Sequence, residues 1–346
     1  MRWDDIYVAS AAAEFGELQT GREAVAAGLL PAEEIERSAQ RSVSVSAGRS
    51  GPELAVAAGR TALASSGRDA RDVGLLIHAD CWYQGLEFWN TAAYVQDQVL
   101  GHGDCVAYEL RQMSNGGMSA LENAAARLTA IPATGAALVT TGDRFADPAF
   151  PRWSTDRGLA FGDAGTAVVL SRTPGPLRLV ATASFSQPML EGLHRGDEPF
   201  RPSGSQAGPL DLVARKKGFL RGRSQDEITT RNETGMMSAV KNCLAEAGGD
   251  IHDMAAVVVP FFGARLSRLQ CLAPLGIGPE VTLQELGLTV GHLGAGDQAA
   301  GVAKLLADDT LRSGDRVLLV GVGAGFSWTC AVLERTGTDT GTGRQR

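Results

Sequence analysis

The chain has 346 residues, 44 % of them hydrophobic, which is enough for a large core and for two domains or two fused halves. Its formal net charge is −7 and its pI about 5.4, so the overall charge does not indicate a nucleic acid or a membrane as a partner. No apolar run approaches the ~18 residues that a membrane-spanning helix requires, and the start is acidic where a signal peptide would be basic, so we expect a cytoplasmic protein.

In chain order, the first half alternates short apolar runs with helical patterns. The sequence predicts a strand over residues 5–9, a polar helical region to about residue 40, a Ser/Gly-rich turn over 42–51, a helix over 52–66, a strand over 73–78, a helix over 90–100, a strand over 105–110, a helix over 117–128 and a strand over 136–141. Short apolar runs of this kind form buried parallel strands, so the alternation indicates an α/β fold with helices on both faces of the sheet.

The second half repeats this scheme. It predicts strands over residues 177–185, 255–259 and 316–322, and helices over 227–247 and 298–306. The strand over 136–143 with its preceding helix resembles the strand over 317–323 with its own, which suggests a duplicated unit of about 170 residues. We therefore expect an N-terminal half over 1–173, a C-terminal half over 174–334 and a disordered tail over 335–346.

The five cysteines lie far apart, and none belongs to a Cys-x-x-Cys pair. They are Cys81, Cys105, Cys243, Cys271 and Cys330. The five histidines do not cluster with them, so the sequence predicts buried free thiols and no structural metal.

A polar segment over residues 186–223, rich in glycine and proline, interrupts the alternation, and we expect it to be a surface excursion. It contains a basic island in an otherwise acidic chain, which comprises Arg215, Lys216, Lys217, Arg221 and Arg223. The island is either a solvated surface or a dock for an acidic partner or a phosphate-bearing substrate.

Ser114 stands between a predicted strand and an alanine-rich predicted helix, with Gly116 and Gly117 just after it. Backbone N–H groups at the start of a helix lack internal partners and carry the positive end of the helix dipole, so an oxygen there lies where negative charge is stabilised. The serine either caps the helix or is a nucleophile.

His292 and Asp297 flank a second glycine-rich turn that precedes a predicted helix. A lone histidine is usually structural, but a carboxylate close in sequence could orient the imidazole as a general base requires. A third glycine-rich segment, over 321–328, superficially matches a dinucleotide loop, but its third glycine is out of register and a strand pattern follows it. We therefore expect no bound cofactor, and we interpret this loop as a source of oxyanion-hole N–H groups.

Taken in order, four motifs resemble those of the β-ketoacyl-acyl-carrier-protein synthase III family. They are the window around Ser114, the segment TDRGLAFGDAGTAVVL over residues 155–170, the glycine loop around His292 and the segment GAGFSW over 323–328. The resemblance runs from residue 5 to residue 333. It implies a thiolase fold, in which two similar βαβαβαββ halves pack as a five-layer α-β-α-β-α sandwich, and a homodimer.

Three positions depart from the family pattern. The family's cysteine nucleophile is Ser114 here, its histidine after a Val-Pro dipeptide is replaced by Phe261, and its asparagine in a Gly-Asn-Thr context is His292. A serine hydroxyl needs a base, whereas a cysteine thiol, which ordinarily titrates at about pH 8.5, is already partly thiolate near neutral pH. The sequence therefore predicts a triad of Ser114, His292 and Asp297.

The resemblance also implies how the substrates are bound. Arg157 would stack on the adenine of coenzyme A, although the tryptophan that usually faces it has no counterpart between residues 25 and 45. An acyl carrier protein would be the second partner, docking on the basic island. Phe261 and Phe262 would narrow the acyl pocket and exclude water from it, which favours a short acyl chain.

The N–H groups of Ser114 and of Ala324 or Gly325 would form the oxyanion hole, and His194 is a candidate for assisting decarboxylation.

Within the family, the serine is similar to that of the priming ketosynthases of daunorubicin and other anthracycline polyketides. This implies an enzyme that acylates itself from a short acyl-CoA, propionyl-CoA being favoured, and condenses the acyl group with malonyl-acyl carrier protein to give a 3-ketoacyl starter unit.

Two alternatives remain open. One is an acyltransferase that moves the acyl group to another carrier protein or a hydroxyl without condensation, because an oxyester is less electrophilic towards a carbanion than a thioester. The other is a non-catalytic partner in a complex.

Overall fold

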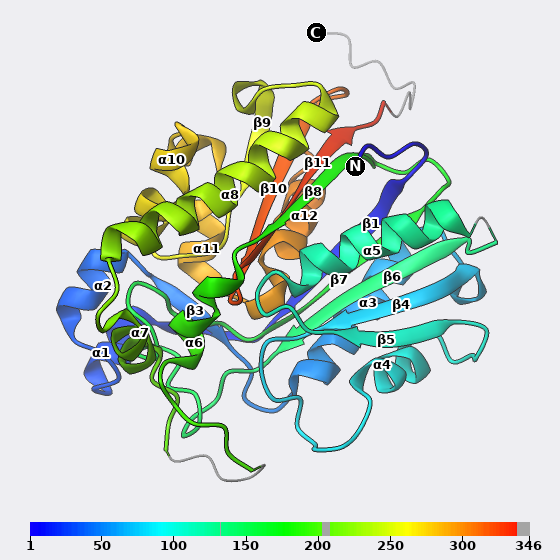
Figure 1. The fold of residues 1–346 in the computed structure, drawn as a ribbon. Helices are drawn as coiled ribbons and strands as arrows, with labels where there is room; N and C mark the ends of the chain where they lie inside the picture. The colour runs from blue at the N-terminus through cyan, green and yellow to red at the C-terminus, as the bar shows by residue number, and fades with distance from the viewer. Residues whose placement is uncertain (132, 203–207, 338–346) are drawn as a thin grey trace, which may run out of the picture.

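The computed structural model describes residues 1–131, 133–202 and 208–337, and its centre is a nine-stranded mixed sheet (Figure 1). The strand order is β5-β4-β6-β7-β1-β8-β11-β10-β9. These strands are β1 Tyr7–Phe15, β4 Val73–Ala79, β5 Val106–Leu110, β6 Ala136–Asp143, β7 Ala164–Ser171, β8 Leu177–Ser186, β9 Met254–Val258, β10 Arg316–Gly323 and β11 Ser327–Arg335. A small separate sheet pairs β2 Glu17–Thr20 with β3 Ser42–Val45.

The helices alternate with the strands as the sequence predicts. Their bounds are α1 Gly21–Ala26, α2 Ala32–Ser38, α3 Gly51–Ser65, α4 Thr91–Val99, α5 Gly116–Ala130, α6 Gly192–Arg195, α7 Leu212–Leu220, α8 Gln225–Ala247, α9 Ala264–Ser267, α10 Ala273–Leu275, α11 Gln284–Val290 and α12 Asp297–Asp308. Local signals explain the starts of the long helices: Ser50 and Glu53 form a capping box at α3, and Ser224 caps α8. Within the described residues, no helix combines the length and apolar character needed to cross a bilayer.

The strand pairing repeats in the two halves of the chain. In the first, β4 is parallel to β6, and β6, β7 and β1 then pair antiparallel in that order. In the second, β9 is parallel to β10, and β10, β11 and β8 follow in the same pattern. Tyr7 and Val8 of β1 pair with β8 and join the halves. We propose a boundary between residues 173 and 174, in the turn between β7 and β8.

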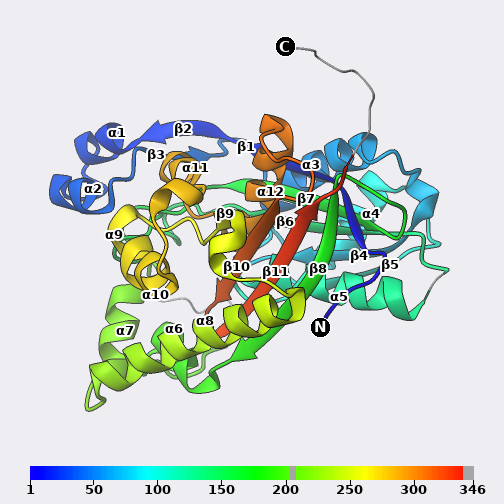
Figure 2. The same cartoon turned by 90° about the horizontal axis from the view of Figure 1, so that it is seen from above.

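The elements stack in five layers (Figures 1 and 2). Helices α5 and α12 lie in the middle layer, where they pack against the inner faces of both half-sheets. Helices α3 and α4 cover the outer face of the first half-sheet, and α8 covers that of the second. Because side chains alternate along a strand, Ile77 of β4 faces the middle layer while its neighbour Leu76 faces α3 and α4.

The structure corrects the predictions for the N-terminal region. The first strand continues to Phe15, where a helical region was expected, and the expected turn over 42–51 contains strand β3. These segments pair with partners distant in sequence, β1 with β7 and β2 with β3, and such partners leave no local signal. The five cysteines are buried free thiols, as predicted.

Two further expectations need correction. The segment over 186–223 carries α6 and α7 and buries Leu190 and Phe219 against α8, so its described part is not only a surface excursion. Arg335 ends β11 and does not begin a tail, because the strand pairs with β8 as far as Leu177. The expectation of disorder otherwise falls mainly on residues 338–346, which lie outside the described residues.

Candidate active site

The site forms where parallel strands end. β4, β5 and β6 run parallel, so their carboxyl ends meet at one edge of the sheet, which is where α/β folds bind ligands. Cys81 follows β4, Ser114 follows β5, and Asp143 ends β6. The second half contributes β10 to the same region, because a Cβ added to Gly323 would lie only 2.2 Å from the carbonyl oxygen of Gln112.

Ser114 lies in a tight turn between β5 and α5. The preceding residue, Met113, has a positive φ of 48°, which non-glycine residues rarely adopt. Asn115 is the N-cap of α5, and its side chain bonds the backbone N–H and the hydroxyl of Thr329 on β11. The helix-cap interpretation of Ser114 is therefore wrong, because its hydroxyl points to another partner.

That partner is His292. Ser114 Oγ lies 2.8 Å from His292 Nε2, and His292 Nδ1 lies 2.6 Å from Asp297 Oδ2. Asp297 opens α12, whereas His292 follows α11, so the short glycine-rich turn between them brings the two side chains together. The structure thus brings the three predicted triad residues into one hydrogen-bond chain.

Asp297 is held by the backbone as well as by the imidazole. Its Oδ1 accepts from the N–H of Leu293 and its Oδ2 from the N–H of Phe261, both at 2.8 Å. Asp297 and His292 are 1 % and 3 % exposed. A carboxylate fixed in this way keeps the proton on Nδ1, which leaves Nε2 as the acceptor for the Ser114 hydroxyl.

Asp143 joins the loops around the triad. Its carboxylate accepts from the N–H groups of Cys81 and Trp82, which follow β4, and from that of Ala295, which lies between His292 and Asp297. Burial, reinforced by nearby Asp80, raises the pKa of Asp143 to about 7. Sequence analysis did not identify this residue, although an acid at the end of an apolar strand is the signal that could have found it.

An aromatic cluster adjoins the nucleophile. Phe145, Phe150 and Phe161 contact one another with ring centroids 4.7 to 4.9 Å apart. Phe161 also packs edge-on against the His292 ring at 5.3 Å, and Cys81 of the same cluster places its Sγ 3.8 Å from Ser114 Oγ. Burial raises the pKa of the Cys81 thiol well above its usual value. No periodic signal in the sequence could have identified this cluster, because its members come from separate loops.

The two phenylalanines predicted to line the acyl pocket differ in position. Phe262 faces the site, with its ring 6.0 Å from that of His292. The side chain of Phe261 packs in the central core with Val290 and Leu293, and its place in the acyl pocket stays a prediction. Its backbone N–H donates to Asp297 Oδ2.

His194 lies near the triad without bonding to it. Its ring stands edge-on to that of Phe326, with centroids 5.7 Å apart, and Phe326 belongs to the turn between β10 and β11. Burial, with help from the nearby charge of Lys216, lowers the pKa of His194 to about 4. The imidazole is therefore neutral near pH 7. The same turn contains Ala324 and Gly325, the predicted oxyanion donors.

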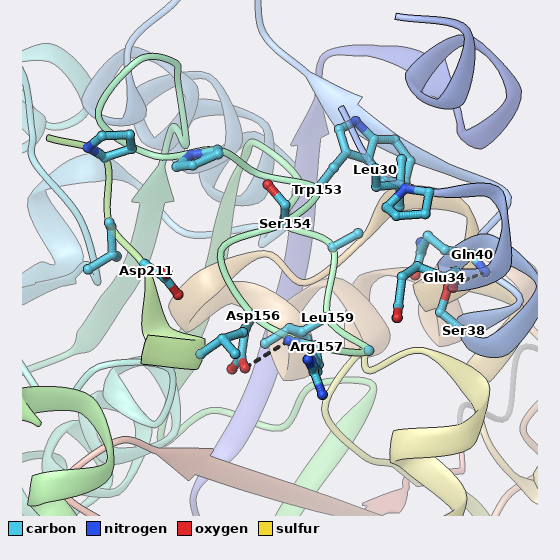
Figure 3. A pocket seen from close by; sticks show the side chains of 17 residues that line it. Leu30, Glu34, Ser38, Gln40, Trp153, Ser154, Asp156, Arg157, Leu159 and Asp211 are labelled. Carbon is cyan, nitrogen blue, oxygen red and sulfur yellow. Dashed lines mark hydrogen bonds between the residues drawn. The ribbon is translucent and has the colours of Figure 1, made fainter. Parts of the chain in front are cut away.

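Arg157 lines an open groove of about 630 Å³ (Figure 3). Residues of α2 and of the start of α7 lie on opposite sides of the groove, and Leu159 and Leu210 are among its lining residues. These two leucines pack against the aromatic cluster, and neighbouring Ala160 accepts a 2.8 Å hydrogen bond from the N–H of His292. The groove therefore adjoins the aromatic cluster whose Phe161 packs against the His292 ring.

Most of the basic island is engaged in local contacts. Arg215 pairs with Glu198, Lys216 with buried Asp156, and Arg221 with Asp197. The guanidinium of Arg223 lies over the Phe219 ring, 4.3 Å from its centroid. Lys217, Arg221 and Arg223 are exposed.

Comparison with known proteins identifies the family. The sequence pattern described as 3-oxoacyl-[acyl-carrier-protein (ACP)] synthase III C terminal matches residues 244–335. β-Ketoacyl-[acyl-carrier-protein] synthase III 2 of Streptomyces coelicolor is 30 % identical over 300 residues, which cover 85 % of this chain and 82 % of that protein. The chain belongs to the β-ketoacyl-acyl-carrier-protein synthase III family. It is an enzyme of the acyltransferase and ketosynthase class, as predicted.

Solved structures agree with this membership in synthase III. ChlB3, described as an acyltransferase, superposes with a TM-score of 0.91 at 33 % identity and covers 96 % of this chain and 98 % of its own. The synthase III of Aquifex aeolicus superposes with a TM-score of 0.76 at 18 % identity over 95 % of this chain and 99 % of its own. The predicted thiolase fold is confirmed.

Proposed function

We propose that this synthase III family member is an acyltransferase that works through an acyl-serine on Ser114. The observation that carries the proposal is the hydrogen-bond chain from Ser114 through His292 to Asp297. A hydroxyl within 2.8 Å of an imidazole nitrogen, with a buried carboxylate on the other nitrogen, is the arrangement that activates serine in acyl transfer.

In the first half-reaction, His292 Nε2 takes the proton of Ser114 as Oγ attacks the thioester carbonyl. The N–H groups of Ser114 and of Ala324 or Gly325 would hold the oxyanion. The carbon–sulfur bond then breaks, and the leaving thiolate receives the proton from His292. In the second half-reaction, His292 deprotonates an acceptor thiol or hydroxyl, which attacks the ester carbonyl. The bond between that carbon and Ser114 Oγ then breaks, and the proton returns from His292 to Ser114.

Two observations favour transfer over condensation. The position of the family's decarboxylating histidine is Phe261, whose side chain lies in the core and offers no proton or hydrogen bond to a substrate. The solved structure with a TM-score of 0.91 is that of an acyltransferase. An ester of serine is also less electrophilic towards a carbanion than the thioester that a cysteine would form.

Condensation is the second candidate, and His194 favours it. A neutral imidazole near the triad could bond the carbonyl oxygen of a malonyl thioester as carbon dioxide leaves. In this mode the enzyme would prime an anthracycline-type polyketide, with propionyl-CoA as acyl donor and malonyl-acyl carrier protein as extender. The exposed cations of the basic island would receive the carrier protein in either mode.

The test is intact-mass spectrometry after incubation with propionyl-pantetheine, propionyl-CoA and propionyl-acyl carrier protein. We expect a gain of one propionyl group from at least one donor, retained in the matched variant Ser119→Ala, on the helix α5 that follows Ser114, and lost in Ser114→Ala. A gain in Ser114→Ala equal to that of the wild type would overturn the acyl-serine mechanism.

Adding malonyl-acyl carrier protein to the acylated enzyme distinguishes the two modes. This carrier protein has no free thiol, so transfer predicts that the propionyl group stays on Ser114 with no release of carbon dioxide, and that holo-acyl carrier protein, added instead, removes the group. Release of one carbon dioxide per propionyl group consumed would instead establish condensation. Loss of this release in His194→Ala would assign His194 to the decarboxylation step.

We also propose that the chain forms a homodimer through β5. This edge strand pairs with β4 and, unlike the other strands predicted to be buried, is exposed: Val106 is 50 % and Tyr108 36 % accessible. An unpaired apolar edge strand favours pairing with a second copy, which a twofold axis satisfies symmetrically.

A further inference from the structure

Asp143 ends β6 and is completely buried, and the acyl-transfer steps described above give it no part. Its carboxylate accepts hydrogen bonds from the N–H groups of Cys81 at 2.9 Å, Trp82 at 2.8 Å and Ala295 at 3.4 Å. All three partners are donors. An ionised carboxylate only accepts, whereas a protonated one turns an oxygen into a donor, so this set of contacts suits the ionised form.

One of these contacts supports the turn over residues 292–297, which carries the base and its orienting acid. Gly294 has a φ of +61° and approaches so closely that an added Cβ would lie 2.3 Å from Asp143 Oδ2. Helix α5 contacts the same turn, because a Cβ added to Gly117 would lie 2.3 Å from the carbonyl oxygen of Ala295. The turn is therefore held both by the Asp143 carboxylate and by the helix that begins just after the nucleophile.

The other contacts fix the segment that lies against the nucleophile. Cys81 and Trp82 follow β4 and both donate to Asp143, and Cys81 Sγ lies 3.8 Å from Ser114 Oγ. A single buried carboxylate thus bonds the segment beside the nucleophile and the turn that carries the base. A displacement of about 1 Å between reacting groups can lower a rate by about 10²-fold, so this shared anchor bears on catalysis.

Building on the acyl-serine function proposed above, we propose that the ionised carboxylate of Asp143 is a positioning residue for acyl transfer. It holds the turn over 292–297 and the segment after β4 in place around Ser114. It acts through the backbone of Cys81 and Ala295 and not on the substrate.

The surroundings of Asp143 show that its charge is not there to stabilise the fold. Burial, reinforced by nearby Asp80, raises the pKa of Asp143 to about 7, so its ionisation near neutral pH costs the folded state free energy that an amide would not cost. Asp80 has Arg111 as a nearby opposite charge. Further ionisable groups on the surrounding elements are Cys81, Glu109, His292, Asp297 and the ion pair of Asp163 with Arg152.

Asp143→Asn tests the proposal. The amide oxygen can accept from one side, but the amide nitrogen then faces backbone N–H groups and leaves one side of the anchor unmade. At pH 8.5 we expect the maximal rate of Ser114 acylation to fall at least tenfold, while the half-saturating donor concentration changes less than threefold. Intact-mass time courses measure both, with whichever of the three propionyl donors above acylates the wild type.

Stability separates positioning from a merely structural role. The urea midpoint of Asp143→Asn at pH 8.5 should stay equal to that of the wild type or rise, because a buried charge has been removed. The control Asp97→Asn, at an exposed carboxylate on α4, should keep the wild-type rate. An unchanged rate in Asp143→Asn, or a rate that falls only together with the urea midpoint, would overturn the proposal.

The pH profile tests the charge itself. Protonation of His292 slows both enzymes and cancels in the ratio of their rates, whereas protonation of Asp143 slows only the wild type. The ratio of the wild-type rate to that of Asp143→Asn should therefore shrink at least threefold between pH 8.5 and pH 6. A ratio that stays constant would show that the ionised form has no part in the effect.

Gly294→Ala provides a second variant, because its Cβ would displace the turn from the Asp143 carboxylate. Its maximal rate should also fall at least tenfold, and the double variant with Asp143→Asn should lose less than threefold more than the slower single variant. Losses that multiply would contradict a shared contact. If no donor acylates the wild type, the acyl-serine function itself fails. If the wild type is acylated and Asp143→Asn matches it, only the role of Asp143 fails.

Discussion

Ser114 owes its proposed reactivity to contacts with residues that lie far away in sequence. A serine hydroxyl is a weak nucleophile until a base accepts its proton, and His292 is positioned to do so only because Asp297 holds its other nitrogen. Asp297 is in turn fixed by the N–H groups of Leu293 and Phe261. The triad therefore depends on backbone geometry on both sides of the glycine-rich turn.

Asp297→Asn tests this dependence. An amide at this position can present its oxygen or its nitrogen to His292, and the wrong tautomer would place the proton on Nε2. We expect the rate of acyl-serine formation to fall by roughly 10³- to 10⁴-fold, as it does when the carboxylate of a serine triad is neutralised. Intact-mass time courses measure this rate.

The matched control is Asp308→Asn, at the exposed end of the same helix, where the carboxylate pairs with Lys304. An exposed pair of this kind is worth ~1 kcal/mol or less, so the control should acylate at the wild-type rate. Equal rates in wild type and Asp297→Asn would remove Asp297 from the mechanism.

Among the predicted elements, β5 forms where the sequence places it but is not buried as expected. The sequence predicts a strand there, and the strand forms, but it lies at the edge of the sheet with Val106 and Tyr108 exposed. The turn that carries Ser114 follows directly from it. If β5 pairs with a second copy, the two nucleophile turns lie close to the dimer interface.

Val106→Lys tests the proposed role of this strand. Val106 begins β5, so a lysine there would place a charge on the edge that the second copy covers, and its desolvation should dissociate the dimer. Light scattering after gel filtration should report 36.2 kDa for the variant and twice that for the wild type. Ile131→Lys, at another exposed apolar residue just after α5, is the control and should remain dimeric. A wild-type monomer, or a dimeric Val106→Lys, would contradict the proposal.

On the scale of the whole molecule, buried titratable groups connect stability to pH. His78 on β4 is fully buried between Thr140, 3.0 Å from Nδ1, and Gln84, 3.4 Å from Nε2. Burial lowers its pKa from 6.5 to about 4. Below pH 6.5 the unfolded chain therefore binds a proton on His78, whereas the folded chain does not bind this proton until about pH 4. The contribution of His78 to stability is thus present above pH 6.5 and is lost as the pH falls.

His78→Gln, which keeps hydrogen-bonding capacity but cannot be protonated, should remove this loss. Between pH 7.5 and pH 5 the wild type should lose about 2 kcal/mol more unfolding free energy than the variant. Urea denaturation at the two pH values measures the difference. His252→Gln, at an exposed histidine on a surface turn, is the control. An identical pH dependence in wild type and His78→Gln would show that His78 does not carry the effect.

Much of this architecture could be predicted from sequence because its signals are local. The helices α3, α5, α8 and α12 and most strands of the large sheet lie within a few residues of their predicted bounds, since apolar periodicity and caps are properties of short segments. Strands β2, β3 and β7 were missed, and each pairs with a partner more than 20 residues away.

The candidate site likewise combines features that the sequence determines with features that only the folded chain determines. Sequence alone determined which residue types were present for acyl transfer: a serine at a helix start, and a histidine with an aspartate around a glycine-rich turn. Only the tertiary structure decided that they meet, since Ser114 and His292 are 178 residues apart and approach to 2.8 Å through the packing of two half-sheets around α5 and α12. It also placed the Phe261 side chain in the core, because side-chain direction depends on neighbours that the chain brings together only when it folds.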